Sequence, residues 1–106
     1  ETVLEIGCGW GGLAAHLAAA GAEVDAISLS DAQLAWARAH HAGPRFLHRD
    51  YRDVAGSYDG IVSVEMVEAL GRENWPQFMD CLARNLRPGG RTALQYISMR
   101  DDLFDA

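Results

Sequence analysis

The sequence predicts an α/β fold, a doubly wound and mostly parallel sheet with helices on both faces. Short apolar runs alternate with segments of helical periodicity along the 106 residues, and this alternation is typical of parallel strands joined by crossover helices. A cluster of glycines follows the first apolar run, where folds of this kind turn from a strand into a helix and bind ligands. Hydrophobic residues make up 49% of the chain, which favours a packed core over disorder.

The first half of the chain predicts two pairs of a strand and a helix. A mostly apolar run ends at the glycine cluster, and Leu13 and Leu17 then share one helical face, which Gly21 is placed to end. Ser30 and Gln33 stand at the spacing of an N-terminal helix cap. The expected order is strand Thr2–Ile6, helix Gly12–Ala20, strand Glu23–Leu29 and a helix from Ser30 to about His41.

The second half predicts three further strands and one long helix. The run GIVSV is rich in β-branched residues, which suit a strand. Pro76 fits the first turn of a helix in which apolar residues recur every four positions as far as Leu86. The Pro-Gly-Gly at 88–90 is expected to stop this helix, with Arg87 near the negative end of its dipole. The expected strands are Arg45–His48, Gly60–Val64 and Arg91–Ser98.

Charge and composition exclude several classes of protein. A net charge of −6 argues against a general grip on nucleic acid, and no apolar run approaches the roughly 18 residues of a membrane span. Cys8 and Cys81 lie far apart and fit no metal spacing, so we expect no metal site and a reducing, cytoplasmic setting. The chain opens on Glu1 and enters a strand at once. We therefore expect residues 1–106 to be one domain, the core of a longer protein.

The glycine loop EIGCGWGG is the most informative stretch for function. Its glycines let the backbone turn sharply and let a ligand approach closely. Glu5 places a carboxylate two residues before the first glycine, which opposes a phosphate and suits an ammonium group. Ser28 and its neighbours occupy the place where an NAD site carries an acidic residue. These features favour S-adenosylmethionine over NAD, and a tight turn without a ligand stays as an alternative.

Four stretches in order resemble one family of enzymes. The element order and the glycine loop resemble the Rossmann-like class I methyltransferases, whose match covers nearly the whole chain. The runs AISLSDAQ, RDYRDV and VSVEMVEALGRENW, together with the loop, resemble the cyclopropane fatty acyl phospholipid synthases and their mycolic acid relatives. The resemblance implies a core of five strands, with the lid and the C-terminal strands of such enzymes lying outside these residues.

The resemblance also implies which residues contact the cofactor. Ser28 and Leu29 would face the ribose and adenine, Asp50 would lie near the adenine amino group, and the ring of Tyr51 would lie beside the base. Gln33 matches a cofactor-contacting position, although helix capping explains it nearly as well. Asp50 has the alternative of a solvated loop carboxylate. The full set of expected cofactor-binding residues is Glu5, Gly7, Cys8, Gly9, Gly11, Ser28, Leu29, Gln33, Asp50, Tyr51 and Glu65.

By the same resemblance, Glu68 and the main-chain carbonyl of Val64 would hold a bicarbonate ion beside the transferred methyl group. An anion there would stabilise positive charge as it develops on an attacked alkene. The chain departs from the family where Ala69 and Gln95 stand in place of histidines, and Gln95 is expected to contact the anion as a hydrogen-bond donor. The alternative for the two glutamates, Glu65 and Glu68, is that they cap or solvate a short helix.

The sequence thus predicts methyl or methylene transfer to the double bond of an unsaturated fatty acyl lipid. Three alternatives stay open: a methyltransferase for another small molecule, an NAD oxidoreductase, and a cofactor-binding module without catalysis. The expected partners are a lipid or small-molecule substrate and a membrane surface, without nucleic acid. The sequence leaves the oligomeric state open.

Overall fold

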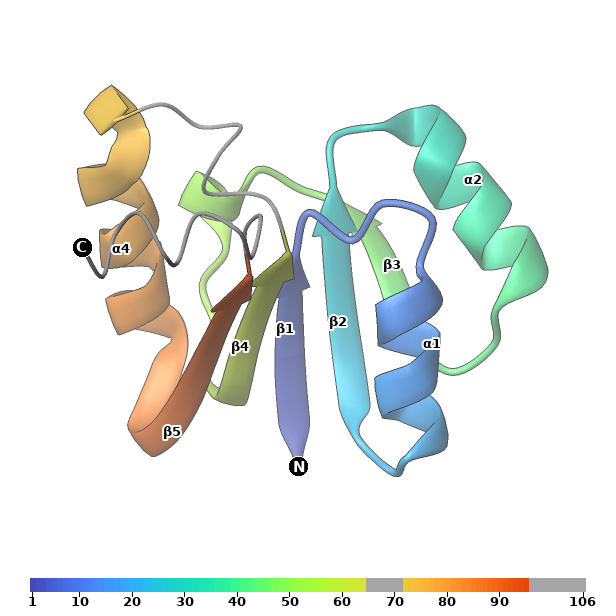
Figure 1. Cartoon of the computed structure of the whole chain (residues 1–106), viewed down its shortest axis with the longest axis horizontal. Helices are drawn as coiled ribbons and strands as arrows, with labels where there is room; N and C mark the ends of the chain where they lie inside the picture. Colours follow the sequence, from blue (N-terminus) through green and yellow to red (C-terminus); the bar gives the residue numbers. More distant parts are fainter. Residues whose placement is uncertain (65–71, 96–106) are drawn as a thin grey trace, which may run out of the picture.

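Five strands form one parallel sheet in a computed structural model that describes residues 1–64 and 72–95. The strands are β1 (Thr2–Ile6), β2 (Glu23–Ser28), β3 (Arg45–His48), β4 (Tyr58–Val64) and β5 (Leu86–Gln95). They lie in the order β3-β2-β1-β4-β5, and every neighbouring pair is parallel. All five therefore point the same way, and their carboxyl ends share one edge of the sheet (Figure 1). The strand order reverses at β1, as in a doubly wound sheet.

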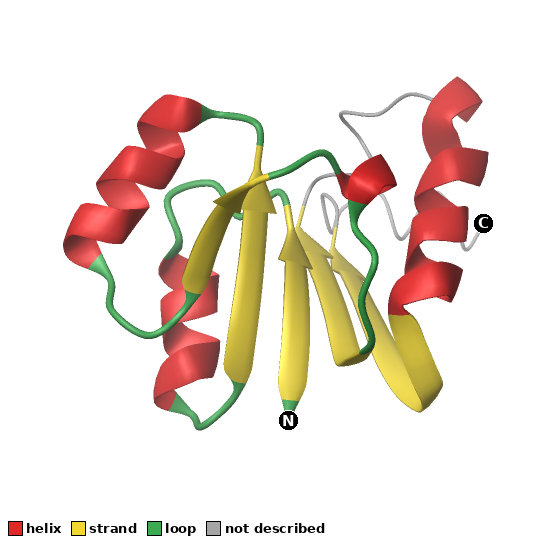
Figure 2. Cartoon of the chain, turned by 180° about the vertical axis from the view of Figure 1, so that it is seen from behind, coloured by secondary structure: helices red, strands yellow, loops and turns green. Residues whose placement is uncertain are grey.

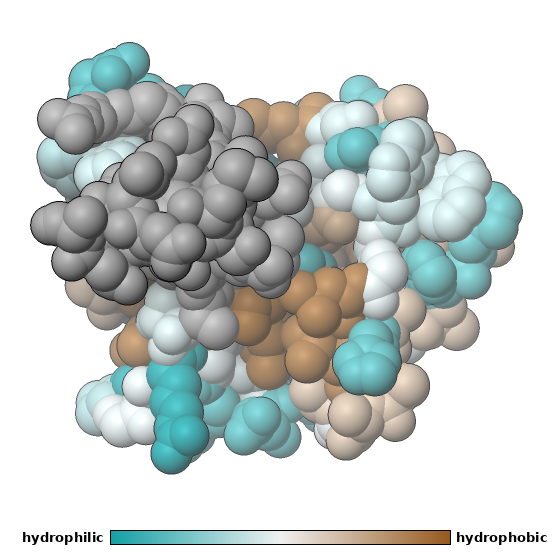
Figure 3. Space-filling model, viewed as in Figure 1, coloured by the Kyte–Doolittle hydropathy of each residue, from teal (hydrophilic) through white to brown (hydrophobic). Residues whose placement is uncertain are grey.

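Helices pack on both faces of this sheet, as predicted. The α-helices are α1 (Gly12–Ala19), α2 (Asp31–His40) and α4 (Trp75–Asn85), and the short 3-10 helices are η1 (Tyr51–Asp53) and η2 (Arg72–Asn74). The layer of α1 and α2 covers one face, and η1 and α4 lie on the other (Figures 1 and 2). Hydrophobic residues also gather on the surface over the middle of the sheet, beside α1 (Figure 3).

Burial on both faces explains why consecutive residues of the central strands β1 and β2 are buried rather than alternately exposed. In β1, Val3 packs with the α1 and α2 layer, whereas Leu4 and Ile6 pack on the α4 side. On the α4 side the fully buried Phe78 ring meets the ring of Tyr51 edge to face, with centroids 5.4 Å apart. The α4 core thereby contacts η1, the element that follows the end of β3.

Most predicted elements are confirmed. The bounds of β1 and β3 agree with the sequence prediction, α1 and α2 end at Ala19 and His40, and β2 ends at Ser28. The strand predicted from Gly60 begins earlier, at Tyr58, because this residue already pairs with Leu86 of β5. The Tyr58 hydroxyl also donates to Asp25 at 2.7 Å. The sequence did not predict η1 or η2.

The boundary between α4 and β5 was predicted wrongly. The helix ends at Asn85 rather than at the Pro-Gly-Gly, and Leu86 already pairs with Tyr58. The Pro-Gly-Gly lies inside β5, where the pairing register shifts between Tyr58 and Gly60. Arg87 does not serve the helix dipole, because its guanidinium pairs with Asp59 at 2.8 Å. Pairing with β4 therefore continues on both sides of these three residues, which usually break a strand, and they form a local irregularity in the sheet.

None of the helices in the described part of the chain has the length and apolar character that a bilayer crossing requires. Within the same residues, no three histidine, cysteine, aspartate or glutamate side chains gather as a metal site needs. Cys8 and Cys81 are both free thiols and both buried.

Candidate cofactor-binding site

A cavity of about 450 Å³ opens at the carboxyl edge of the sheet, on the β2 and β3 side of β1. This is where open α/β sheets bind ligands, next to the point at which the strand order reverses. Of the residues predicted to contact a cofactor, those that line the cavity are Gly7, Ser28, Leu29, Asp50 and Tyr51. Those described by the structure that do not line it are Glu5, Cys8, Gly9, Gly11 and Gln33.

Three backbone N–H groups of the glycine loop donate hydrogen bonds within the protein. The N–H groups of Gly7 and Cys8 both donate to the carbonyl of Ile27 at 3.0 Å, and the N–H of Gly11 donates to the carbonyl of Cys8 at 3.0 Å. A dinucleotide loop binds its pyrophosphate through free N–H groups at this place. Because these three amides already have acceptors, the loop is poorly suited to a phosphate and better suited to a ligand without one.

Two glycines of the loop have different roles. A Cβ at Gly9 would meet nothing within 4 Å, and its φ is +56°, so the backbone there borders open space. A Cβ on Gly11 would lie 2.9 Å from the ring of Phe46 and 3.0 Å from the Cβ of Ala37. Gly11 also has φ +90° and precedes α1 as its N-cap. The structure therefore explains Gly11 by close packing, whereas Gly9 has a positive φ beside open space.

We expect Gly11→Ala to lower the free energy of unfolding by about 2 kcal/mol, because alanine at positive φ is strained and its methyl group overpacks against Phe46. Urea denaturation followed by circular dichroism measures the change. Gly12→Ala is the matched control, since a Cβ there meets nothing within 4 Å and Gly12 begins α1. That control should gain about 0.5 kcal/mol from helix propensity. Equal effects of the two substitutions would contradict the packing role of Gly11.

Glu5 is the one buried acidic side chain in the described chain that lacks a hydrogen-bond partner at one of its oxygens, Oε1. The residue is 2% exposed, and burial raises its pKa from 4.5 to about 7. Burial, together with the charge of Glu5, also raises the pKa of Cys8 to about 11, so that thiol stays protonated. An orphaned carboxyl at the base of the glycine loop fits a ligand that brings a positive charge to it.

Short polar contacts shape the turn after β2. The hydroxyl of Ser28 accepts from the N–H of Ser30 at 3.0 Å, and the hydroxyl of Ser30 accepts from the N–H of Gln33 at 3.2 Å. The second contact makes Ser30 the N-cap of α2, as predicted. The N–H of Ser30 donates to Ser28, so the Gln33 side chain does not complete a capping box. Leu29 is 62% exposed and lies at the cavity, where it offers apolar surface to a bound ring.

Asp50 and Tyr51 frame the far side of the cavity from the end of β3. Oδ1 of Asp50 accepts from the N–H of Arg52 at 2.9 Å and thereby begins η1. The Arg52 guanidinium beside it lowers the pKa of Asp50 below its ordinary value. Asp50 is therefore not a freely solvated carboxylate. Tyr51 is 8% exposed, and burial raises its pKa.

The expected catalytic residues are only partly within the described structure. Val64 and Gln95 end β4 and β5 and are paired with each other across the sheet, so their backbones lie side by side at the carboxyl edge. Glu65 and Glu68 lie outside the described residues. Sequence reasoning missed Arg52, which lines the cavity. Its signal was the spacing of opposite charges in the run RDYRDV.

Known structures define the class of this domain. A TehB-like SAM-dependent methyltransferase from Corynebacterium glutamicum is similar with a TM-score of 0.80 at 19% identity, over 98% of this chain and 61% of that one. Mycolic acid cyclopropane synthase CmaA1, complexed with SAH and CTAB, has a TM-score of 0.78 at 26% identity, over 88% of this chain and 35% of that one. The fold is that of a Rossmann-like methyltransferase domain, as predicted.

Sequence comparison then gives the family. The sequence model of the family described as mycolic acid cyclopropane synthetase matches residues 1–104. Tuberculostearic acid methyltransferase UfaA1 of Mycobacterium tuberculosis is 48% identical over 92% of this chain and 24% of its own length. Cyclopropane-fatty-acyl-phospholipid synthase of Escherichia coli K12 is 40% identical over 95% of this chain and 28% of its own length. The chain belongs to the mycolic acid cyclopropane synthetase family, and it spans about a quarter of the length of these relatives.

Proposed function

We propose that the chain is the S-adenosylmethionine-binding core of an enzyme that transfers a methyl or methylene group to the double bond of an unsaturated fatty acyl lipid. The family and the names of its relatives support a lipid substrate. The observation that carries the proposal is the buried Glu5 carboxyl without a partner, beside a loop whose first amides are already paired. That combination suits a cationic nucleoside and disfavours a diphosphate.

The residues present suit the parts of this cofactor. The carboxylate of Glu5 would attract an ammonium group, and the open backbone at Gly9 gives room for the methionine portion. Asp50 would accept a hydrogen bond from the adenine amino group, and Tyr51 would border the ring. Bound S-adenosylmethionine supplies an electrophilic methyl group on sulfur. The amino acids thus bind and orient the ligand at the carboxyl edge of the sheet.

The chemistry would take place where β4 and β5 end. Under this proposal, Glu68 and the carbonyl of Val64 hold a bicarbonate ion, and Gln95 lies on the neighbouring strand to donate a hydrogen bond to it. A fixed negative charge would stabilise positive charge as it develops on the acyl chain. At an effective dielectric near 20, such a charge about 4 Å away contributes on the order of 4 kcal/mol.

The substrate and the setting follow from the same family. We expect the protein to meet its lipid at a membrane surface on the cytoplasmic side. The buried free thiols of Cys8 and Cys81 are typical of a reducing compartment.

The experiment is to incubate the purified protein with methyl-labelled S-adenosylmethionine and vesicles of unsaturated phospholipid. We expect label in the acyl chain, because the family and the names of its relatives favour this acceptor. Vesicles of saturated phospholipid are the control, since they lack the double bond. Label in a soluble acceptor with none in lipid would contradict the lipid substrate and favour a methyltransferase for another small molecule.

That second candidate is favoured by a specific observation, the replacement of two family histidines by Ala69 and Gln95. Glutamine cannot take up a proton at neutral pH, so simple methylation of another acceptor needs less from this site than cyclopropanation does. The two candidates share the cofactor and differ in the acceptor and therefore in the product. Preferential binding of NAD would indicate an NAD oxidoreductase. Cofactor binding without any turnover would indicate a non-catalytic module.

Binding itself is tested by calorimetry with S-adenosylhomocysteine and NAD. We expect S-adenosylhomocysteine to bind and NAD to fail, because the buried carboxyl of Glu5 opposes a phosphate and three of the loop amides are already paired within the protein. Gly9→Ala adds a methyl group at φ +56° to a residue that is expected to contact the cofactor, and it should weaken binding of S-adenosylhomocysteine by about tenfold or more, equivalent to about 1.4 kcal/mol. Gly12→Ala should bind like the parent, since Gly12 is not among the expected cofactor contacts. Preferential binding of NAD would overturn the proposed cofactor.

A further inference from the structure

We propose that Arg52 is a positioning residue that makes the site selective for a 6-aminopurine, because its guanidinium holds the carboxylate of Asp50 in one orientation at the cavity. The inference rests on the proposed function, since it concerns the base of the nucleoside expected there. Both side chains belong to residues that line the cavity. The carboxylate precedes η1 as its N-cap, and the guanidinium comes from within that helix.

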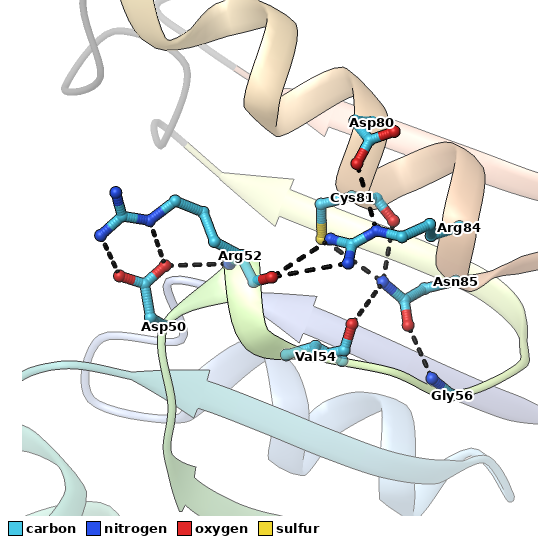
Figure 4. A network of polar contacts seen from close by, with 8 residues as sticks. All are labelled: Asp50, Arg52, Val54, Gly56, Asp80, Cys81, Arg84 and Asn85. Atoms are coloured by element: carbon cyan, nitrogen blue, oxygen red, sulfur yellow. Dashed lines mark hydrogen bonds and ion pairs between the residues drawn. The ribbon is translucent and has the colours of Figure 1, made fainter.

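The pairing of the two side chains is bidentate (Figure 4). Nε of Arg52 donates to Oδ1 of Asp50 at 3.0 Å, and Nη2 donates to Oδ2 at 2.6 Å. The backbone N–H of Arg52 also donates to Oδ1 at 2.9 Å. Two parallel bonds between planar groups fix the rotation of the carboxylate as well as its place. The Asp50 side chain is 18% exposed and that of Arg52 is 57% exposed, so the pair is partly open to solvent.

The contacts leave Asp50 with an unused acceptor. An ionised carboxylate offers about four lone-pair positions, and Arg52 fills both of those on Oδ1 and one on Oδ2. The remaining position on Oδ2 can accept one further N–H. An exocyclic amino group supplies such a donor, whereas a keto oxygen at the same place would face a negative charge. A carboxylate kept ionised by an arginine therefore discriminates between the two kinds of purine.

Helix α4 holds the backbone on which Arg52 stands. Both terminal nitrogens of Arg84 approach the carbonyl of Arg52, at 3.5 and 3.4 Å. Arg84 is itself oriented by Asp80 one turn earlier, at 3.2 Å. Figure 4 shows these residues in line from α4 to the paired side chains of Asp50 and Arg52. Arg52 is thus held at its main chain by α4 while its side chain is left to orient the carboxylate.

The test compares two ligands that differ at one position of the base. Calorimetry gives the dissociation constants of S-adenosylhomocysteine and S-inosylhomocysteine, the 6-keto analogue, for the protein and its variants. We expect the parent to prefer the amino ligand strongly. Arg52→Ala should reduce that preference by about tenfold, which corresponds to the loss of the charge-assisted hydrogen bond between the amino group of the ligand and Asp50. Arg52→Lys keeps one charged donor and should restore part of the preference.

Arg87→Ala is the matched control. Its guanidinium pairs with Asp59 at 2.8 Å, and the two side chains are 56% and 21% exposed, close to the 57% and 18% of the Arg52 and Asp50 pair. It should leave the ligand preference unchanged, which separates the loss of any surface ion pair from the loss of this one.

Three outcomes would overturn the inference. If Arg52→Ala weakens both ligands by the same factor, its role is structural support of η1. If it changes neither dissociation constant, Asp50 needs no partner to select the base. If the parent binds neither ligand, the proposed function fails and the inference fails with it, and this outcome is distinct from the other two.

Discussion

Replacing Glu5 by glutamine is expected to stabilise the unliganded protein by about 3 kcal/mol at pH 8 and to change its stability little at pH 4. Burial raises the pKa of this carboxyl from 4.5 to about 7, and each tenfold change in its proton affinity is worth about 1.36 kcal/mol. Above pH 7 the folded protein must carry a buried charge whose Oε1 has no partner. Glutamine is neutral at every pH and avoids that penalty.

The sign follows from proton linkage. Between pH 4.5 and about 7 the folded state holds the Glu5 proton more tightly than the unfolded state does. The free energy of unfolding therefore falls as the pH rises through this window, and the stability that the protonated form supplies below pH 4.5 is lost above pH 7. Glu5→Gln should flatten this part of the profile.

Urea denaturation between pH 4 and pH 8 measures the effect. Glu23→Gln, at an exposed position at the start of β2, is the control and should shift stability by less than about 0.5 kcal/mol. Glu5→Gln should also bind S-adenosylhomocysteine more weakly than the parent, because the neutral amide no longer attracts the ammonium group. A gain in stability that is equal at pH 4 and pH 8 would contradict the burial of an ionisable carboxyl.

Asn85→Ala is expected to lower the free energy of unfolding by about 3 kcal/mol. The side chain is fully buried, and its Nδ2 donates to the carbonyls of Val54 and Cys81 at 3.1 and 2.8 Å. Its Oδ1 accepts from the N–H of Gly56 at 2.8 Å. Alanine leaves the buried carbonyl of Val54 without this donor and opens a small cavity, and each loss costs about 1–3 kcal/mol.

The change should also loosen the segment after η1, since Asn85 is the side chain that joins residues 54 and 56 to α4 (Figure 4). Hydrogen exchange at these amides, together with urea denaturation, measures both effects. Gln77→Ala on the exposed side of α4 is the control, and its stability should stay within about 0.5 kcal/mol of the parent. Unchanged exchange in residues 54–56 would contradict the role of Asn85 as their anchor.

Features that depend on local chemistry were predictable from the sequence. Glycines must follow β1 because the turn there needs positive φ and an open approach at Gly9. Ser30 caps α2 through a contact three residues away. The alternation of apolar strands and helices predicted a parallel sheet with right-handed crossovers, and the family resemblance, drawn from four motifs, is confirmed.

The α4 and β5 boundary shows where such reasoning stopped. Pro-Gly-Gly predicts a helix stop because these residues disfavour regular structure, yet the helix already ends at Asn85. The carboxamide of Asn85 binds the carbonyl of Cys81 and backbone about thirty residues away, and Leu86 pairs with Tyr58. These partners are distant in the chain, so no local pattern reveals them.

The sequence by itself thus determined the order of elements, the glycine loop and the acidic residue before it, because each depends on neighbours within a few positions. Only the tertiary structure decided that Glu5 is buried without a partner, that Gly11 lies against Phe46, and that α4 supports the segment carrying Arg52. Burial and pairing arise when elements far apart in the chain pack together. The charge of a side chain is encoded locally, but the free energy of that charge depends on what surrounds it.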